Sequence, residues 1–493
     1  MTESINIIKK KTKNDTTNDD SSLDIERERD VAGEGAYGCV HKPSIHCKKG
    51  IQSNFDYDEY VSKIMTTNHA KTELKEFVVI GRYDKTNEYH LGTPILCSPK
   101  LDTSVYRDIA KCKYISDAEI KKNPNDYKLL LLKYGGPDLK HFCSDEIKKY
   151  LKTDKRVKTD NFWLEVHHLL KGLKFFKDNG LVNNDIKPHN ILFDTKTGQL
   201  KYIDFGLMRD RNKVIKSSKD NDNFLSVFHW SYPFDCGFMN KTKYNHYLSA
   251  SKAQREKYKT EISELIIAKS GKNTFKLPIN NPNAFNVLFS YINPHATPTT
   301  KYAYIADFFD SFSNLVDTEK YMVVLNRIVD SIDVFGLGFT LQFMLNCFNK
   351  QKAVNMETFT RLSIFFHKMY DFNIITREIN ISALIDEYET ILLETGILSR
   401  LKKSFVNHVP VNKSPSTTKI IQKKQTETNE LDEFAKLDAN TEINIKNMST
   451  QKTNKKKQIN NKTRRCPHGK HQNRLTKRCV VNNKSVKNKS VIQ

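Results

Sequence analysis

Two short polar segments near the middle of this 493-residue chain constrain its fold more than any other feature. The first is residues 183–190, Asn-Asn-Asp-Ile-Lys-Pro-His-Asn, and the second is the Asp-Phe-Gly of residues 204–206, which begins 19 residues after Asp185. Apolar residues at helical spacing in 161–177 predict a helix that ends directly before the first segment. Strand-like residues on both sides of a turn at 196–198 predict a small hairpin between the two segments. A helix and a hairpin are therefore expected to position both loops.

The residue types in these segments are those that phosphate transfer to a hydroxyl requires. That reaction needs a carboxylate beside the hydroxyl, oxygen ligands for Mg²⁺ and a cation near the γ-phosphate. Asp185 is the predicted catalytic base, and Lys187 is placed to reach the γ-phosphate. The Asn190 amide oxygen and the Asp204 carboxylate are the predicted metal ligands. The alternative, a polar loop followed by a plain turn, does not explain their joint spacing.

A glycine-rich turn lies far upstream of these segments. Backbone amides in such a turn can approach triphosphate oxygens without a Cβ in the way, although the pattern alone is weak because most such turns are only turns. Further along, residues 128–134 read as a buried strand that stops at a Gly-Gly-Pro break. The predicted nucleotide-binding residues of the turn are Gly33, Glu34, Gly35, Ala36, Tyr37, Gly38, Cys39 and Val40.

Taken in order, these motifs resemble the eukaryotic-type protein kinase superfamily, and Asp185-x-Lys187-x-x-Asn190 looks like its serine/threonine branch. The resemblance implies an α+β fold with two lobes, a strand-rich N-lobe and a helical C-lobe, that binds ATP and Mg²⁺ in the cleft. It further implies transfer of the γ-phosphate of ATP to Ser or Thr hydroxyls of protein substrates. The domain is expected at 29–405, with the N-lobe at about 29–133, the hinge at about 134–139 and the C-lobe at about 140–405.

The resemblance also calls for a lysine that grips the α- and β-phosphates, but the gap after the glycine-rich turn is longer than in the family. Lys63, in a strand-like piece, is our choice, with Lys42 and Lys48 as poorer candidates. Its expected ion-pair partner on the following helix is Glu73, with Glu76 second. A solvated strand lysine is the alternative for Lys63.

The chain departs from the family pattern just before the catalytic base. The usual His-Arg pair is replaced by Asn183-Asn184. In the family that arginine pairs with a phosphorylated residue of the activation segment, and asparagine cannot make a bidentate charge-assisted pair. We therefore expect activity without phosphorylation of that segment, although Ser217, Ser218, Ser226 and Ser231 lie within it.

Three further residues are assigned supporting roles by the resemblance. Asp235 takes the place of the acid that ends the activation segment, and Arg377 is its expected buried partner. Asp333, read as the start of an apolar helix, matches the aspartate that braces the backbone of the catalytic loop. The alternative for Asp333 is an ordinary aspartate at a helix N-terminus.

Composition divides the rest of the chain. Residues 1–28 are polar and expected to be a disordered tail, residues 236–330 are expected to be a partly ordered insertion, and residues 406–493 are expected to be a basic, mostly disordered tail. After residue 410 there are 20 Lys/Arg against 6 Asp/Glu, so +14 of the net charge of +23 belongs to this tail. Nucleic-acid binding by the tail is left open, because it has almost no aromatic side chains to stack on bases.

Cysteine use and hydropathy bear on the compartment. The nine cysteines are too scattered for a disulfide framework, and most are expected to be buried thiols. No apolar run approaches the roughly 18 residues that span a bilayer, and the start has no apolar signal region. We therefore expect a protein of a cytoplasm-like compartment that is not secreted.

Residues 466–480 form a Cys-containing element in the basic tail. A zinc site is conceivable there, but the spacing is not that of a zinc ribbon or finger. The element resembles a Cys-Pro-x-Gly-Lys to Arg-Cys-Val sequence found in giant nucleocytoplasmic DNA viruses, and residues 134–139 resemble the hinge of their kinases. This likeness implies a viral protein of the host cell cytoplasm, with packaging in the virion left open. The rival functions are a pseudokinase or scaffold without turnover, and a tail that tethers the chain to nucleic acid or virion proteins.

Overall fold

The computed structural model describes residues 29–35, 38–51, 55–220, 230–268, 282–401, 470–472 and 479–481. It divides into two units, Met1–Val409 and Pro410–Gln493. The second unit contributes only the antiparallel strands β10 (Lys470–Gln472) and β11 (Cys479–Val481). The predicted disordered tails otherwise lie outside the described residues.

The N-terminal part of the first unit is built on one antiparallel sheet. Its strand order is β1-β2-β3-β5-β4, so the glycine-rich hairpin of β1 and β2 lies at one edge. The predicted buried strand at 128–134 is confirmed as β5, the fourth strand in this order. Its successive leucine side chains point to opposite faces of the sheet. The strands are β1 (Asp30–Gly35), β2 (Gly38–Lys42), β3 (Tyr60–Thr66), β4 (Ile95–Cys97) and β5 (Tyr127–Lys133).

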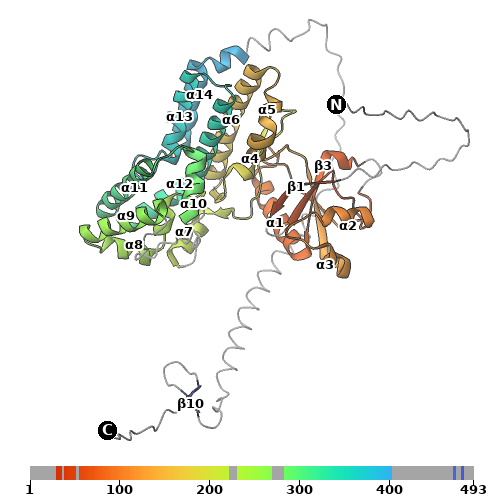
Figure 1. Cartoon of the computed structure of the whole chain (residues 1–493), viewed down its shortest axis with the longest axis horizontal. Helices are drawn as coiled ribbons and strands as arrows, with labels where there is room; N and C mark the ends of the chain where they lie inside the picture. Colours follow the sequence, from red (N-terminus) through yellow and green to blue (C-terminus); the bar gives the residue numbers. More distant parts are fainter. Residues whose placement is uncertain are drawn as a thin grey trace, which may run out of the picture. The chain divides into compact units, whose positions relative to one another are not determined.

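Helices cover the two faces of this sheet. α1 (Thr67–Tyr83) contacts β3 and β5, and its buried Ala70 and Leu74 pack with Met65 and Leu130. On the other face, α2 (Thr103–Ile109) and α3 (Asp117–Lys122) bury apolar residues against a second cluster that includes Cys39 and Ile64. Figure 1 shows these elements in red and orange. The two faces of β2 and β3 thus carry different neighbours.

The C-terminal part is helical, and one large apolar cluster joins its elements. Figure 1 shows these helices from yellow to blue. The short strands pair as β6 with β9 and β7 with β8, which confirms the predicted hairpin between the two polar segments. The elements are α4 (Leu139–His141), α5 (Ile147–Tyr150), α6 (Lys155–Asp178), β6 (Leu181–Val182), β7 (Ile191–Phe193), β8 (Leu200–Tyr202), β9 (Arg209–Asp210), α7 (Arg211–Asp220), α8 (Lys241–Leu248), α9 (Lys252–Ile267), α10 (Pro282–Ile292), α11 (Pro298–Thr318), α12 (Tyr321–Lys350), α13 (Met356–Tyr370) and α14 (Ile381–Glu394).

The central helix corrects two sequence expectations. α12 begins at Tyr321, so Asp333 lies in its middle and not at its start. Among the described residues, α12 alone is long and apolar enough to cross a membrane by length and composition, although no such run was expected; 89% of its apolar window is buried inside the protein. A helix enclosed by other helices carries apolar residues on all sides, which hides its start and mimics a membrane span. The predicted insertion at 236–330 contains α8 to α11 and the start of α12.

The expectation of unpaired thiols is wrong for four cysteines. Cys39 is bonded to Cys112 and Cys47 to Cys97, with Cα atoms 6.1 and 5.8 Å apart. Of the other cysteines, Cys143, Cys236 and Cys347 are free. The partners are 73 and 50 residues apart in the sequence, so only the packing of α2 and β4 beside the β1–β2 hairpin brings them together.

Candidate active site

The first polar segment follows β6 and ends in a short turn, residues 188–190, that leads into β7. Asp185 is held there by two neighbours. The Lys187 Nζ lies 2.8 Å from both carboxylate oxygens, and the Asn190 Nδ2 donates to Oδ2 at 2.8 Å and to the Asp185 carbonyl at 2.9 Å. Only 11% of the Asp185 side chain is exposed. The structure therefore brings the predicted base, the predicted phosphate-facing lysine and one predicted metal ligand into one network.

The electrostatics of this network make the carboxylate of Asp185 more basic than an ordinary aspartate. Burial raises the pKa of Asp185, while Lys187 and the Asn190 hydrogen bond oppose that rise and Asp204 adds to it. A substrate hydroxyl that replaced the lysine contact would meet a carboxylate that is more basic than one in water. Since Asn190 donates through its nitrogen, its amide oxygen remains available as a ligand.

Asp204 follows β8 and adopts a left-handed conformation with φ of +59°. Such a backbone is uncommon for a residue with a Cβ and costs about 1–3 kcal/mol, so it persists only where surrounding contacts impose it. Phe205 supplies such contacts, because it is buried and packs edge-on against Phe77 of α1 and Phe176 of α6 at 5.9 and 6.4 Å. The metal-ligand candidate is thus anchored by the residue that follows it.

Lys63 lies in the middle of β3, opposite Val40 of β2. Its Nζ is 2.8 and 2.6 Å from the two carboxylate oxygens of Glu73 on α1. A Cβ on Gly38 would lie 3.0 Å from the Lys63 side chain, so the glycine leaves room for it. Lys42, a weaker candidate, lies 3.1 Å over the ring centre of Tyr134 instead. Of the remaining predicted nucleotide-binding residues, Ala36 and Tyr37 lie outside the described part of the chain.

Asp333 reaches the catalytic loop from the middle of α12. Its Oδ2 accepts from the Asn183 amide at 2.7 Å and its Oδ1 from the Asn184 amide at 2.8 Å. Burial raises the pKa of Asp333 to about 6, although the two amide hydrogen bonds lower it. A Cβ on Gly336 would lie 2.5 Å from the Ile186 carbonyl oxygen, so α12 approaches this loop more closely than any other residue would permit. Helix and loop form one rigid support.

Residues 139–231 match the family described as the protein kinase domain. Over these residues the chain is similar to the eukaryotic-type protein kinase superfamily, and curated kinases match it as well. It is 36% identical over 194 residues to cyclin-dependent kinase B2-1 of Arabidopsis thaliana, a match that covers 38% of this chain and 51% of that kinase.

Two shorter matches extend this result. Over 87 residues the chain is 34% identical to cell division control protein 2 homolog D of Antirrhinum majus, a match that covers 18% of this chain and 27% of that protein. Over 63 residues it is 38% identical to a protein of Acanthamoeba polyphaga mimivirus named as a serine/threonine-protein kinase/receptor, covering 13% of this chain and 4% of that protein. The chain thus spans about half the length of the first relative and far less of the other two.

Asp235 and Arg377 form a buried ion pair. The Arg377 Nη1 lies 2.6 Å from Asp235 Oδ2, and the two side chains are 1% and 0% exposed. Arg377 also donates to the Ser331 hydroxyl at 2.9 Å and to the Asp371 carbonyl at 2.7 Å. The two residues that the sequence analysis paired therefore meet, 142 positions apart.

The side chains of the two asparagines before the base form hydrogen bonds with backbone groups. Asn184 has a φ of +64°, and its side-chain amide donates to the carbonyls of Val182 and Leu207 at 3.1 and 3.0 Å. The Asn183 Oδ1 accepts from the Asp185 amide at 3.0 Å. These short side chains stabilise the loop by local hydrogen bonds, where the family pattern has a longer histidine and arginine.

Glu76 has a place that the sequence analysis did not predict. It was our second choice as partner of Lys63, but Glu73 takes that position, and Glu76 lies one helical turn further along α1. Burial raises the pKa of Glu76 to about 7, and the carboxylates of Glu73 and Asp204 add to the effect. The i, i+3 spacing of the two glutamates was the signal that both share one face of α1.

Proposed function

We propose that this chain is an active serine/threonine protein kinase that transfers the γ-phosphate of ATP to protein hydroxyl groups. The observation that carries the proposal is the network in which Lys187 and Asn190 hold the carboxylate of Asp185. In the proposed mechanism Asp185 orients the substrate hydroxyl and accepts its proton, while Lys187 offsets charge on the transferring phosphate. The residues assigned to this chemistry follow one another in the order found in serine/threonine kinases: Asp185, Lys187, Asn190 and Asp204.

ATP and Mg²⁺ are the cofactors of this proposal. Carboxylate and amide oxygens are hard ligands that suit Mg²⁺, so Asp204 and Asn190 would hold it. Bound Mg²⁺ would neutralise charge on the phosphates. Lys63, oriented by Glu73, would hold the α- and β-phosphates below the β1–β2 hairpin. The sheet with α1 and the helices around α12 would then be the two lobes, with residues 134–139 as the hinge.

Substitution of Lys63 tests the nucleotide side of the site. Lys63→Met removes the cation and leaves Glu73 without its partner, so we expect phosphate transfer to fall about 10²–10³-fold, as when one preorganised donor is removed. Transfer to a generic acceptor protein is the measurement. Lys71→Met, on the exposed face of the same helix as Glu73, is the control and should keep wild-type activity. Equal activity of the two variants would refute the assignment of Lys63.

Phosphorylation of the activation segment should be dispensable. Asn184 is engaged with Val182 and Leu207, and the Ser218 hydroxyl is buried and donates to the Val214 carbonyl at 2.7 Å. Because Asn184 offers no charge to a phosphate, we expect phosphatase-treated protein to keep its activity, with intact mass spectrometry to verify removal of phosphate. Loss of activity that returns with rephosphorylation would contradict this prediction.

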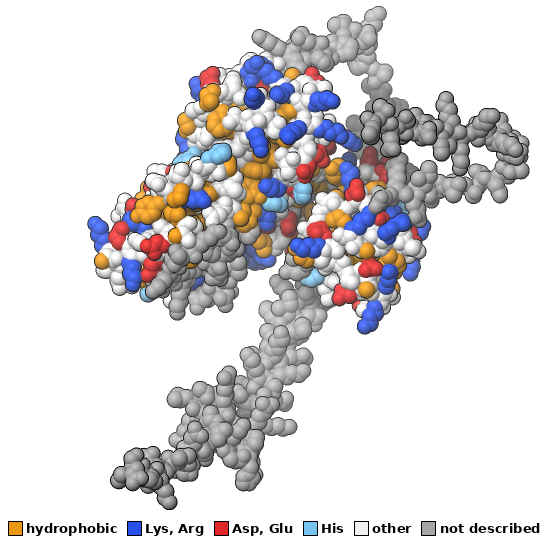
Figure 2. All heavy atoms as spheres, viewed as in Figure 1, with side chains coloured by type: hydrophobic (Ala, Val, Ile, Leu, Met, Phe, Trp, Pro, Cys, Tyr) orange, Lys and Arg blue, Asp and Glu red, His pale blue; other side chains and the backbone are white. Residues whose placement is uncertain are grey.

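The rival functions differ in measurable ways. A pseudokinase would be stabilised by Mg-ATP against heat without any transfer, although Asp185 and Asp204 are both present. A tail tether would lose nucleic-acid or virion-protein binding when residues 406–493 are deleted, while catalysis survives. Figure 2 shows Lys and Arg side chains interspersed with Asp and Glu over the described part of one face, so this face offers no specific support for nucleic-acid binding.

We further propose that the kinase is encoded by a large DNA virus and acts in the host cytoplasm or in the virion. The likeness to the mimivirus protein and the tail element at 466–480 support a viral source. The two disulfides are more typical of an oxidising compartment than of a reducing cytosol. Virions analysed by mass spectrometry, with and without reduction, would locate the protein and its thiol state.

A further inference from the structure

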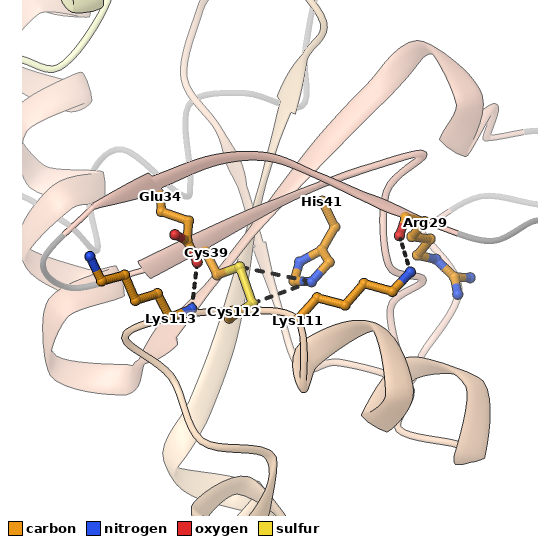
Figure 3. The surroundings of a disulfide bond; sticks show 7 residues. All are labelled: Arg29, Glu34, Cys39, His41, Lys111, Cys112 and Lys113. Atoms are coloured by element: carbon orange, nitrogen blue, oxygen red, sulfur yellow. Dashed lines mark hydrogen bonds between the residues drawn. A yellow bond between two sulfur atoms is a disulfide. The ribbon is translucent and has the colours of Figure 1, made fainter.

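A cluster of sulfur and nitrogen atoms lies behind the glycine-rich hairpin. Cys39 and His41 are two residues apart on β2, so their side chains point to the same face of the sheet. Cys112, in the loop between α2 and α3, reaches them from the other side, as Figure 3 shows. The Val40 side chain lies on the opposite face of β2, and Val40 pairs there with Lys63 of the neighbouring strand β3. The cluster is therefore separate from the proposed nucleotide site.

The three side chains have the spacing of a ligand set. The His41 Nε2 lies 3.9 Å from the Cys39 Sγ and 3.6 Å from the Cys112 Sγ. All three ligand atoms lie within 4.8 Å of one another. Among the described residues, no other group of three histidine, cysteine or acidic side chains comes together in this way. The cluster is thus distinct from the ordinary contacts of the fold.

His41 is not explained by the disulfide beside it. Its ring is fully buried, and its Nδ1 has no partner of good hydrogen-bond geometry within the described structure, although the Asp108 backbone acts on the ring. Its Nε2 faces only sulfur, a weak hydrogen-bond partner. A buried imidazole without good partners is costly, so a further role for it is expected.

We propose that the reduced chain binds one Zn²⁺ through Cys39, His41 and Cys112. Two thiolates and one imidazole are a common zinc ligand set, and three protein ligands leave a fourth position for water. The negative charges of the two thiolates balance the charge of Zn²⁺, so the buried complex carries no net charge. The carboxylate of Asp108, which acts on His41, is already paired with Arg29 and Lys111 at 3.2 and 3.3 Å.

Zinc binding and the disulfide exclude each other. A dithiol reductant breaks the Cys39–Cys112 bond, giving up two electrons and two protons to form two thiols and itself becoming a disulfide. Zn²⁺ then displaces the two thiol protons and forms two Zn–S bonds. Zn–S bonds of about 2.3 Å hold two sulfurs roughly 3.8 Å apart, so the sulfurs must separate. Cys112 is partly buried in its loop, whereas Cys39 and His41 are fully buried.

Either link would anchor the hairpin to the same loop. The Glu34 carboxylate accepts from the Lys113 amide at 2.5 Å, and the Lys111 Nζ donates to the Arg29 carbonyl at 3.1 Å (Figure 3). These contacts keep the loop near β1 whether the sulfurs are bonded to each other or to zinc. The redox state would thus change the nature of the link and preserve its position.

The second disulfide supplies a matched control. Cys47–Cys97 joins the same region of the sheet, but no third ligand of the kind found at Cys39 accompanies it in the described part of the chain. Cys466 and Cys479 in the tail form a separate potential zinc-binding site, which would add to the measured zinc. Every protein in the test therefore carries Cys466→Ser and Cys479→Ser, and this parent is otherwise the full chain.

The test measures zinc bound per chain after reduction, incubation with Zn²⁺ and gel filtration. We expect about one zinc in the parent and in Cys47→Ser/Cys97→Ser, and at least a tenfold loss in Cys39→Ser, Cys112→Ser and His41→Gln. Near-ultraviolet circular dichroism checks folding, and the parent itself, reoxidised with diamide, should release its zinc. Absence of zinc from the reduced, folded parent would overturn the proposal. So would undiminished zinc in the folded variants or in the reoxidised parent.

Discussion

Replacement of Asp185 by asparagine is expected to lower kcat by about 10²–10⁴-fold, the usual contribution of a positioned general base. The change keeps the size of the side chain but removes the carboxylate that we propose accepts the hydroxyl proton. Lys187 and Asn190 can still donate to the remaining amide oxygen, so the loop should keep its conformation. ATP binding should be nearly unchanged, because the phosphates are assigned to Lys63 and to the metal ligands. Steady-state phosphate transfer and nucleotide titration measure the two quantities separately.

The control for this experiment is Asp178→Asn, which replaces an exposed carboxylate at the end of α6 that pairs with the exposed Lys174. It should leave kcat at the wild-type value. Wild-type transfer by Asp185→Asn would remove the base from the mechanism. Loss of both transfer and ATP binding would instead indicate a collapsed loop, and a thermal melt would reveal it.

Of all the substitutions named above and below, Arg377→Ala is expected to lower the free energy of unfolding the most. Arg377→Ala leaves the carboxylate of Asp235 buried and unpaired, and breaking a buried ion pair in this way costs about 3–5 kcal/mol. The hydrogen bonds to Ser331 and to the Asp371 carbonyl are lost as well. Chemical denaturation followed by circular dichroism measures the free energy of unfolding.

Two comparisons make this prediction specific. Arg361→Ala breaks exposed pairs with Glu357 and Glu394, and should cost less than about 1 kcal/mol. The double change Asp235→Leu/Arg377→Met replaces the pair by apolar side chains and should recover most of the stability. A similar loss for Arg377→Ala and Arg361→Ala would show that the buried pair is not a stabilising anchor of the activation segment.

Several features of the catalytic region were predictable because they depend on local spacing. The helix before Asn183 and the hairpin before Asp204 follow from periodicity and turn residues, and both are present as α6 and β7–β8. The α6 helix nevertheless begins at Lys155, earlier than the expected residue 161. Its first turns carry many charged residues, which weaken the apolar pattern that marks a helix.

Other features required contacts between distant residues. Asp333 was expected at a helix start, yet α12 begins 12 positions earlier and the carboxylate reaches the loop from mid-helix. The pairing of Cys39 with Cys112 depends on where the loop after α2 packs. Cysteine spacing alone does not determine connectivity, and the scattered cysteines of this chain gave no sign of a disulfide framework. Unpaired thiols were therefore expected.

The sequence by itself determined the chemical character of the site, because Asp185, Lys187 and Asn190 lie within one short loop and Asp204 follows after one hairpin. Local spacing is enough to bring such residues together. Only the tertiary structure decided that Glu73 and not Glu76 meets Lys63, and that a buried histidine lies against two cysteines. Those relations depend on strand register and helix packing, which bring together residues far apart in the chain.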